Sequence, residues 1–141
     1  MSKELILKKL EQIRKLLDEL ESLVEKPFQE FIQHFITVRA AERNFQLVVD
    51  LASDINTHIL IERGEQTPDS YRQSFQYMQR IGILSDNIAD KLVDSAKIRN
   101  ILVHEYDFEE DYRKFYDSVK AILPLYREYL KKIYTFVEEW P

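Results

Sequence analysis

The sequence contains no cysteine, only two glycines and no long run of hydrophobic residues. Without cysteine, the chain has no disulfide, no zinc–thiolate site, no iron–sulfur cluster and no thiol nucleophile. Gly64 and Gly82 alone cannot build the glycine-rich loops that hold nucleotide phosphates. These absences exclude disulfide-framed scaffolds and the common nucleotide-binding sheet folds.

The chain also lacks a membrane-spanning segment and an excess of positive charge. No apolar run approaches the roughly 20 residues that cross a bilayer, and residues 1–20 mix charges with leucines, unlike a signal peptide. The net charge of −5 argues against a large basic surface for nucleic acid, but it permits a local cationic pocket. We therefore expect a cytoplasmic protein with no membrane contact, folded as a single domain over residues 1–141.

Hydrophobic residues recur at helical spacing, and no segment alternates convincingly at period two. A heptad-like stripe predicts a first amphipathic helix, with Ile6, Leu10, Ile13, Leu17, Leu20 and Val24 on one face. This stripe fits either packing within a bundle or a dimer surface. Pro27 interrupts the pattern, and the aromatic segment 28–35 either begins the second helix or forms its own turn. A second helix is predicted over residues 38–61, with Gly64 as its C-terminal cap.

Start and stop signals predict three more helices in the second half of the chain. Thr67 is predicted to cap a short third helix that runs to about Arg80, and Gly82 ends it. A fourth helix opens at Ser85 and Asp86.

Asp107 and Glu110 form a variant capping box for a fifth helix. Pro124 is predicted to kink or split that helix. The resulting fold class is all-α, a compact bundle of about five helices.

The segment RNILVHEY, residues 99–106, contains the side chains best suited to catalysis. Arg99 has a permanently charged guanidinium with several N–H donors, His104 is of a residue type that titrates near neutral pH, and Tyr106 offers a phenol hydroxyl. On an ideal helix, Arg99 and Tyr106 lie about 20° apart, whereas His104 lies roughly 140° from Arg99. Either the helix unwinds near His104, or a second copy of the chain completes the cleft. From residue types alone, a capping pair is a more common use of such residues than catalysis.

The motif and the order of helices around it resemble the HEPN superfamily, and within it the HepT-like toxins of prokaryotic toxin–antitoxin pairs. The likeness also includes AAERNFQLVVDLASDINTHIL in the second helix, TPDSYRQSFQYM in the third and GILSDNIADKLVDSAKIRNILVHEY in the fourth. The resemblance implies a homodimer that cleaves RNA without a metal or other cofactor. It implies Arg99 and His104 as the catalytic pair, with the pairs of two protomers meeting in one cleft.

The resemblance also assigns roles to three further residues. It implies that Tyr106 lines the RNA cleft and that it receives AMP from an MntA-like nucleotidyltransferase antitoxin, which silences the toxin. The alternative for Tyr106 is a core tyrosine with its hydroxyl at the surface. Asn100 follows the arginine of the motif and orients either the substrate or Arg99, or it makes only a structural hydrogen bond. Asp54, on the second helix, either faces the cleft and orients substrate or is a solvated side chain. A different function, a non-catalytic HEPN subunit that binds or regulates a nucleotidyltransferase, would keep the same motif.

Overall fold

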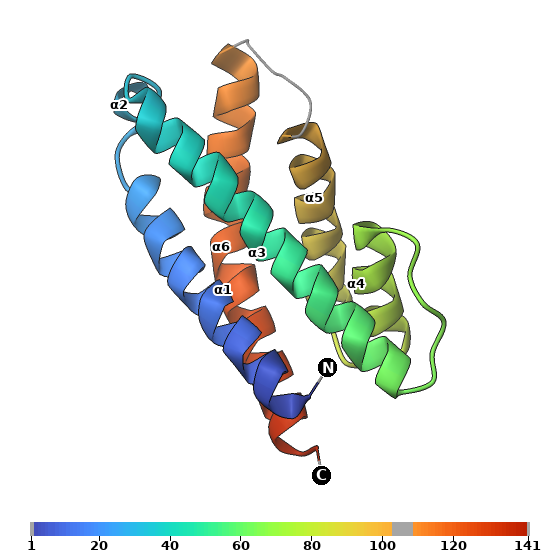
Figure 1. Cartoon of the computed structure of the whole chain (residues 1–141). Coiled ribbons are helices and arrows are strands. Elements are labelled where there is room, and N and C mark those ends of the chain that lie inside the picture. The colour runs from blue at the N-terminus through green and yellow to red at the C-terminus, as the bar shows by residue number, and fades with distance from the viewer. Residues whose placement is uncertain (1, 103–108, 141) are drawn as a thin grey trace.

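The structure, a computed structural model, describes residues 2–102 and 109–140 and is helical throughout, with no strand in these two ranges (Figure 1). The helices are α1 (Lys3–Leu23), α2 (Phe28–Phe31), α3 (Phe35–Glu62), α4 (Tyr71–Arg80), α5 (Asp86–Leu102) and α6 (Glu109–Glu138). The expected all-α fold class is confirmed. The aromatic segment after Pro27 contains a separate one-turn helix, α2, which was one of its two predicted forms.

Long helices alternate in direction around a shared core. α1 and α5 run one way and α3 and α6 the other, with the short α4 packed against α3 and α5 (Figure 1). The core cluster takes side chains from all six helices. All six members of the predicted α1 stripe are buried in it. The stripe is therefore used for packing within the chain, and the alternative of a dimer surface along it is excluded.

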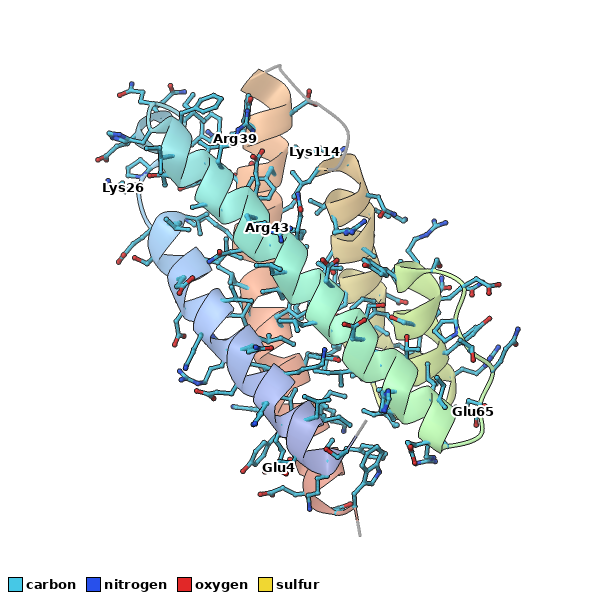
Figure 2. The ribbon with its side chains drawn as sticks, viewed as in Figure 1. Glu4, Lys26, Arg39, Arg43, Glu65 and Lys114 are labelled. Atoms are coloured by element: carbon cyan, nitrogen blue, oxygen red, sulfur yellow. The ribbon has the colours of Figure 1, made fainter. Side chains whose placement is uncertain are left out.

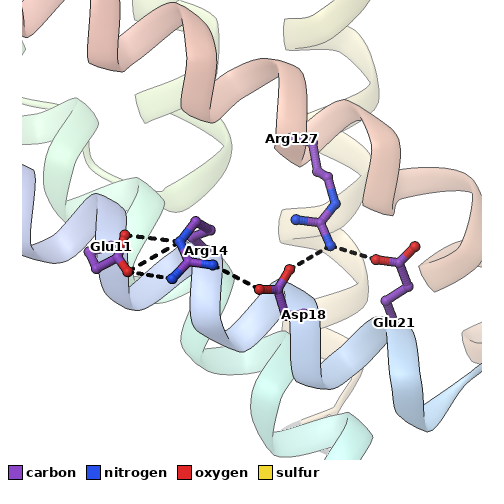
Figure 3. A network of polar contacts seen from close by, with 5 residues as sticks. All are labelled: Glu11, Arg14, Asp18, Glu21 and Arg127. Atoms are coloured by element: carbon purple, nitrogen blue, oxygen red, sulfur yellow. Dashed lines mark hydrogen bonds and ion pairs between the residues drawn. The ribbon is translucent and has the colours of Figure 1, made fainter.

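Polar contacts join α1 to α6 along the outside of the bundle. Arg127 of α6 donates to Asp18 of α1 at 2.9 Å, and Asp18 also accepts from Arg14 at 2.9 Å (Figure 3). At the end of the bundle, Lys3 donates to the carbonyl of Glu138 at 3.1 Å. Exposed ion pairs of this kind contribute little individually, so the buried core supplies most of the packing energy between α1 and α6.

Both glycines end helices as predicted. Gly64 has φ +71°, and its N–H donates to the carbonyl of Ile61 while the N–H of Glu65 donates to that of Leu60. Gly82 has φ +82° and follows α4 with the same pair of bonds. This pattern is the Schellman motif, which needs a residue that tolerates the left-handed region.

The predicted start of the third helix was wrong by one turn. α4 is capped by Ser70, whose hydroxyl accepts from the N–H of Gln73 at 3.1 Å, whereas Thr67 lies exposed in the preceding loop. The side chain of Gln73 in turn accepts from the N–H of Asp69 at 2.7 Å. Ser70 caps the helix because Gln73, three residues later, returns a hydrogen bond to the chain before the helix, in an arrangement similar to a capping box. Thr67 has no such partner.

Pro124 lies inside α6 without splitting it, since the helix continues to Glu138. The proline is exposed, so the carbonyl that loses its donor can bond to water, and the buried Tyr126 and Tyr129 hold the following turns to the core. The predicted Asp107–Glu110 capping box lies outside the described residues and side chains. Within the described ranges, no helix has both the length and the hydrophobicity needed to cross a bilayer.

Candidate functional site

Arg99 is held in the last turn of α5 by a carboxylate from α3. One face of α5 is buried through Ile88, Leu92 and Ala96. Arg99 follows on that face, and its Nε lies 3.1 Å from Oδ1 of Asp50. The two side chains are 24% and 31% exposed, so the pair is shielded on one side and accessible to a ligand on the other.

Tyr71, the first residue of α4, completes this contact from a third helix. The Arg99 guanidinium lies over the Tyr71 ring, 4.7 Å from the ring centroid, and the Tyr71 hydroxyl lies near the Asp50 carboxylate. Burial raises the pKa of the Tyr71 phenol. The neighbouring Asp50 carboxylate raises this pKa further, because ionisation would put a negative oxygen beside it. Tyr71 therefore stays neutral and remains a donor at physiological pH.

A buried hydrogen-bond network fixes the backbone that carries Tyr71. The hydroxyl of Ser74 donates to the Tyr71 carbonyl at 2.8 Å and accepts from Asn56 of α3 at 3.2 Å. Asn56 accepts in turn from the hydroxyl of Tyr129 on α6 at 2.7 Å. Ser74, Asn56 and Tyr129 are fully buried, so the network ties α3, α4 and α6 together at the turn that carries Tyr71.

The structure brings only some of the predicted site residues close to Arg99. Asn100 is exposed beside Arg99, and its Oδ1 lies 3.5 Å from an amino nitrogen of Arg99, a long contact. Asp54 is exposed on the same face of α3 as Asp50 and pairs with Lys9 at 3.5 Å. His104 and Tyr106 lie outside the described residues.

The sequence reasoning missed Asp50 and Tyr71. Asp50 lies four residues, about 40° around the helix, from Asp54, so both acids share one face of α3. Only the stagger between α3 and α5 selects Asp50 as the partner of Arg99. One feature of the sequence could have indicated Tyr71. It directly follows the Ser cap, and an aromatic side chain at the start of a helix can reach a neighbouring helix.

Cations gather between the site and the end of the bundle where α5 ends and α6 begins. Figure 2 labels Arg39 and Arg43 on α3 and Lys114 on α6 in this region. Arg39 pairs with the buried Glu42 at 2.7 Å. Arg43 and Lys114 are exposed, and neither has an ion pair with another described residue.

Lys114 also lines a mainly apolar hollow beside the last turn of α5. Its lining comprises Ile98, Ile101, Leu102, Asp111, Lys114, Phe115 and Ser118. Arg43 lies seven residues before Asp50, two turns along the same face of α3. Positive charge therefore continues from Arg99 toward this end of the molecule. Among the side chains that the structure describes, no group of three or more His, Asp or Glu residues is placed to hold a metal ion.

Comparison with known proteins places most of the chain in one family. Residues 8–133 match the sequence model of the family described as Ribonuclease HepT-like. A tRNA nuclease HepT from Aphanizomenon flos-aquae is 28% identical over 129 residues, covering 92% of this chain and 87% of the relative. An mRNA nuclease HepT from Shewanella oneidensis is 24% identical over 131 residues, covering 84% of this chain and 98% of the relative.

Solved structures share the fold. A tri-AMPylated HEPN toxin from Shewanella oneidensis, in complex with an MNT antitoxin, superposes with a TM-score of 0.69 at 24% identity, covering 86% of this chain and 99% of that one. A toxin–antitoxin complex with AMP-PNP gives a TM-score of 0.73 at 22% identity over 98% of both chains. At these identities the structures establish the helical architecture.

Proposed function

Because the chain belongs to the HepT-like ribonuclease family, we propose that it is the toxin of a toxin–antitoxin pair and cleaves RNA without a metal ion. The relatives named above are tRNA and mRNA nucleases. The observation that most supports an active rather than a degenerate member is the anchored Arg99, which contacts Asp50 and Tyr71 from two other helices.

The chemistry of the motif suits attack by an RNA 2′-hydroxyl on the adjacent 3′ phosphate. A base must remove the hydroxyl proton, a cation must stabilise the charge that develops on the phosphorus oxygens, and an acid must protonate the leaving 5′ oxygen. His104 supplies the proton transfers because its ordinary pKa lies near neutrality. Arg99 supplies a permanent charge, and its terminal amino groups remain available because Asp50 contacts Nε.

A homodimer would bring two Arg99–His104 pairs into one cleft, with Asn100 and Asp54 orienting substrate at its edges. Mixing two inactive variants tests this arrangement. Arg99→Ala and His104→Ala are each expected to abolish cleavage, and their heterodimer should recover part of it because one Arg99 and one His104 then share the cleft. Failure to recover activity, with a monomer seen by light scattering, would contradict the dimeric cleft.

Control by an antitoxin is proposed to act at Tyr106. Tyr106 lies seven residues after Arg99 in the sequence. The negative phosphate of an AMP group on this phenol would compete with RNA phosphate for the guanidinium. With ATP and an MntA-like nucleotidyltransferase, the chain is expected to gain mass in AMP steps and to lose RNA cleavage. Tyr106→Phe should still cleave RNA and should resist silencing. A Phe variant that is silenced as readily as wild type would place the target elsewhere.

The decisive experiment is cleavage of a defined RNA by metal-stripped protein in EDTA, with product ends analysed by mass. Cleavage should persist in EDTA, leave 2′,3′-cyclic phosphate ends and disappear in Arg99→Ala. A folded, dimeric wild-type protein that leaves tRNA and mRNA intact would contradict the proposed activity and favour the non-catalytic regulatory subunit. Cleavage that stops in EDTA and returns with added metal would contradict metal independence.

A further inference from the structure

We propose that Tyr71 is a positioning residue that holds the guanidinium plane of Arg99 for the reaction. The catalytic consequence rests on the proposed function, whereas the positioning itself is a property of the fold. Tyr71 lies 28 residues before Arg99 and outside the Arg99–Tyr106 motif. Its role follows from its ring contact with Arg99.

The contacts of Arg99 with Asp50 and with Tyr71 restrain different motions of its side chain. The ion pair with Asp50 fixes the Nε edge of the guanidinium, but it leaves rotation about that contact free. The Tyr71 ring, 4.7 Å away, covers one face of the group and removes this rotation. Together the two contacts leave the opposite face and the terminal amino groups available to a phosphate, which is the part of arginine that forms bidentate bonds.

Tyr71 itself is rigid enough to act as a support. Its carbonyl is tied through Ser74 to Asn56 and Tyr129 in the buried core. A functional group is positioned accurately when its supporting side chains are themselves held by packing and hydrogen bonds. The core network therefore reaches Arg99 through Tyr71.

The ring and the hydroxyl make separable contributions. The ring contacts Arg99, whereas the hydroxyl lies near Asp50. Tyr71→Phe keeps the ring and should retain cleavage within about threefold of wild type. Tyr71→Leu removes the ring and should lower kcat by about tenfold or more, with a smaller change in KM, because misplacement of a catalytic group mainly affects the transition state.

The matched control is Tyr77, which lies on the same helix and stacks with Arg80 at 4.2 Å. Tyr77 lies six residues along α4, about 120° away around the helix from Tyr71. Tyr77→Leu should therefore lose a comparable aromatic–arginine contact while leaving kcat unchanged. An equal loss of activity in the Tyr77 and Tyr71 variants would show that α4 acts only through general stability, and would overturn the proposal.

A double-mutant cycle tests whether Tyr71 acts through Arg99. In an Arg99→Lys background with measurable residual cleavage, Tyr71→Leu should cause little further loss, because the planar group that the ring supports is already gone. Fully multiplicative losses would mean that Tyr71 affects cleavage independently of Arg99, and would overturn the proposal.

A measurement without RNA separates this inference from the proposed function. The Nε–H proton of Arg99, assigned by NMR, should exchange slowly with solvent in wild type and Tyr71→Phe and at least several-fold faster in Tyr71→Leu. If wild type cleaves no RNA but shows this pattern, the positioning role stands and the proposed nuclease activity fails. If exchange is unchanged in Tyr71→Leu, the positioning role fails whatever the activity.

Discussion

At the residue scale, the site depends on a side chain that can serve two anions at once. Asp50 occupies the Nε edge of Arg99, and in the proposed reaction the terminal amino groups bind the phosphate. The guanidinium can do this because its five N–H donors lie in one plane and point in different directions. A lysine ammonium is a compact point charge and has no separate edges with which to bind two anions.

We therefore expect Arg99→Lys to lose most of the RNA cleavage, although it keeps the positive charge. The loss should be about tenfold or more in kcat/KM, which corresponds to about 1.4 kcal/mol of transition-state stabilisation. Steady-state kinetics on a defined RNA measure it, and circular dichroism verifies that the helices remain. Cleavage at the wild-type rate would show that Arg99 acts through charge alone.

Buried tyrosines also set how the stability of the protein depends on pH. Burial raises the pKa of both Tyr126 and Tyr129 well above the ordinary value of 10.0. Below pH 10 both phenols are neutral whether the chain is folded or unfolded, so their contribution to stability is fully present. Above pH 10 the unfolded chain ionises first, and the free energy of unfolding should fall as the pH rises further.

Urea unfolding between pH 8 and pH 11 tests this expectation. Tyr126→Phe should be about 1 kcal/mol less stable at pH 8, because its hydrogen bond with Ser95 at 2.7 Å is lost. The difference from wild type should narrow above pH 10, since the variant has one buried phenol fewer. A wild-type stability that stays constant to pH 11 would contradict the expectation.

At the element scale, α4 is the helix that links the core to the site. It is short, with 10 residues, and an isolated helix of this length is marginal in water. Its ends are closed by the Ser70 cap and by Gly82 after the last turn. Its first turn carries Tyr71, so the cap at that end also fixes the support of Arg99.

Ser70→Ala is expected to lower the free energy of unfolding by about 1 kcal/mol, the usual cost of losing a side-chain N-cap. Thr67→Ala should change it by less than about 0.5 kcal/mol, because Thr67 is exposed and caps no helix. Chemical denaturation of the two variants measures both values. Equal destabilisation by the two substitutions would contradict the assignment of the cap to Ser70.

At the scale of the whole molecule, a net negative chain presents local positive charge near the proposed RNA site. The net charge is −5, yet Arg43 and Lys114 are exposed beside the end of α5. RNA binding by such a protein has to use a confined set of cations, since the rest of the surface repels phosphate. Arg39 is a poor probe of this set, because its removal would strand the buried Glu42 carboxylate.

The double variant Arg43→Ala, Lys114→Ala should weaken RNA binding and reduce its salt dependence. If each side chain contacts one phosphate, the slope of log K against log salt should become less steep by about 1.4. Fluorescence anisotropy with a catalytically inactive His104→Ala background measures both quantities. Lys132→Ala, on the exposed C-terminal part of α6, is the control and should leave the slope unchanged. An unchanged slope in the double variant would contradict a phosphate contact by these residues.

Most of the helical architecture was accessible from the sequence, because the signals involved are local. Apolar spacing identified the buried stripe of α1, and the glycines marked the ends of α3 and α4. The motif around Arg99 pointed to a nuclease family, and the match over residues 8–133 establishes that family. The chain therefore determined by itself its fold class, its family and the arginine at the centre of the proposed site.

The tertiary structure alone decided which side chains surround Arg99. Asp50 and Asp54 lie on one face of α3, one turn apart, and helical periodicity does not distinguish them. The stagger of α3 against α5 is set by how their buried side chains interlock. It places Asp50 next to Arg99, whereas Asp54 pairs with Lys9. Tyr71 reaches the pair because the buried network fixes the start of α4 against α3. Such contacts depend on the relative position of three helices, and no local pattern encodes that position.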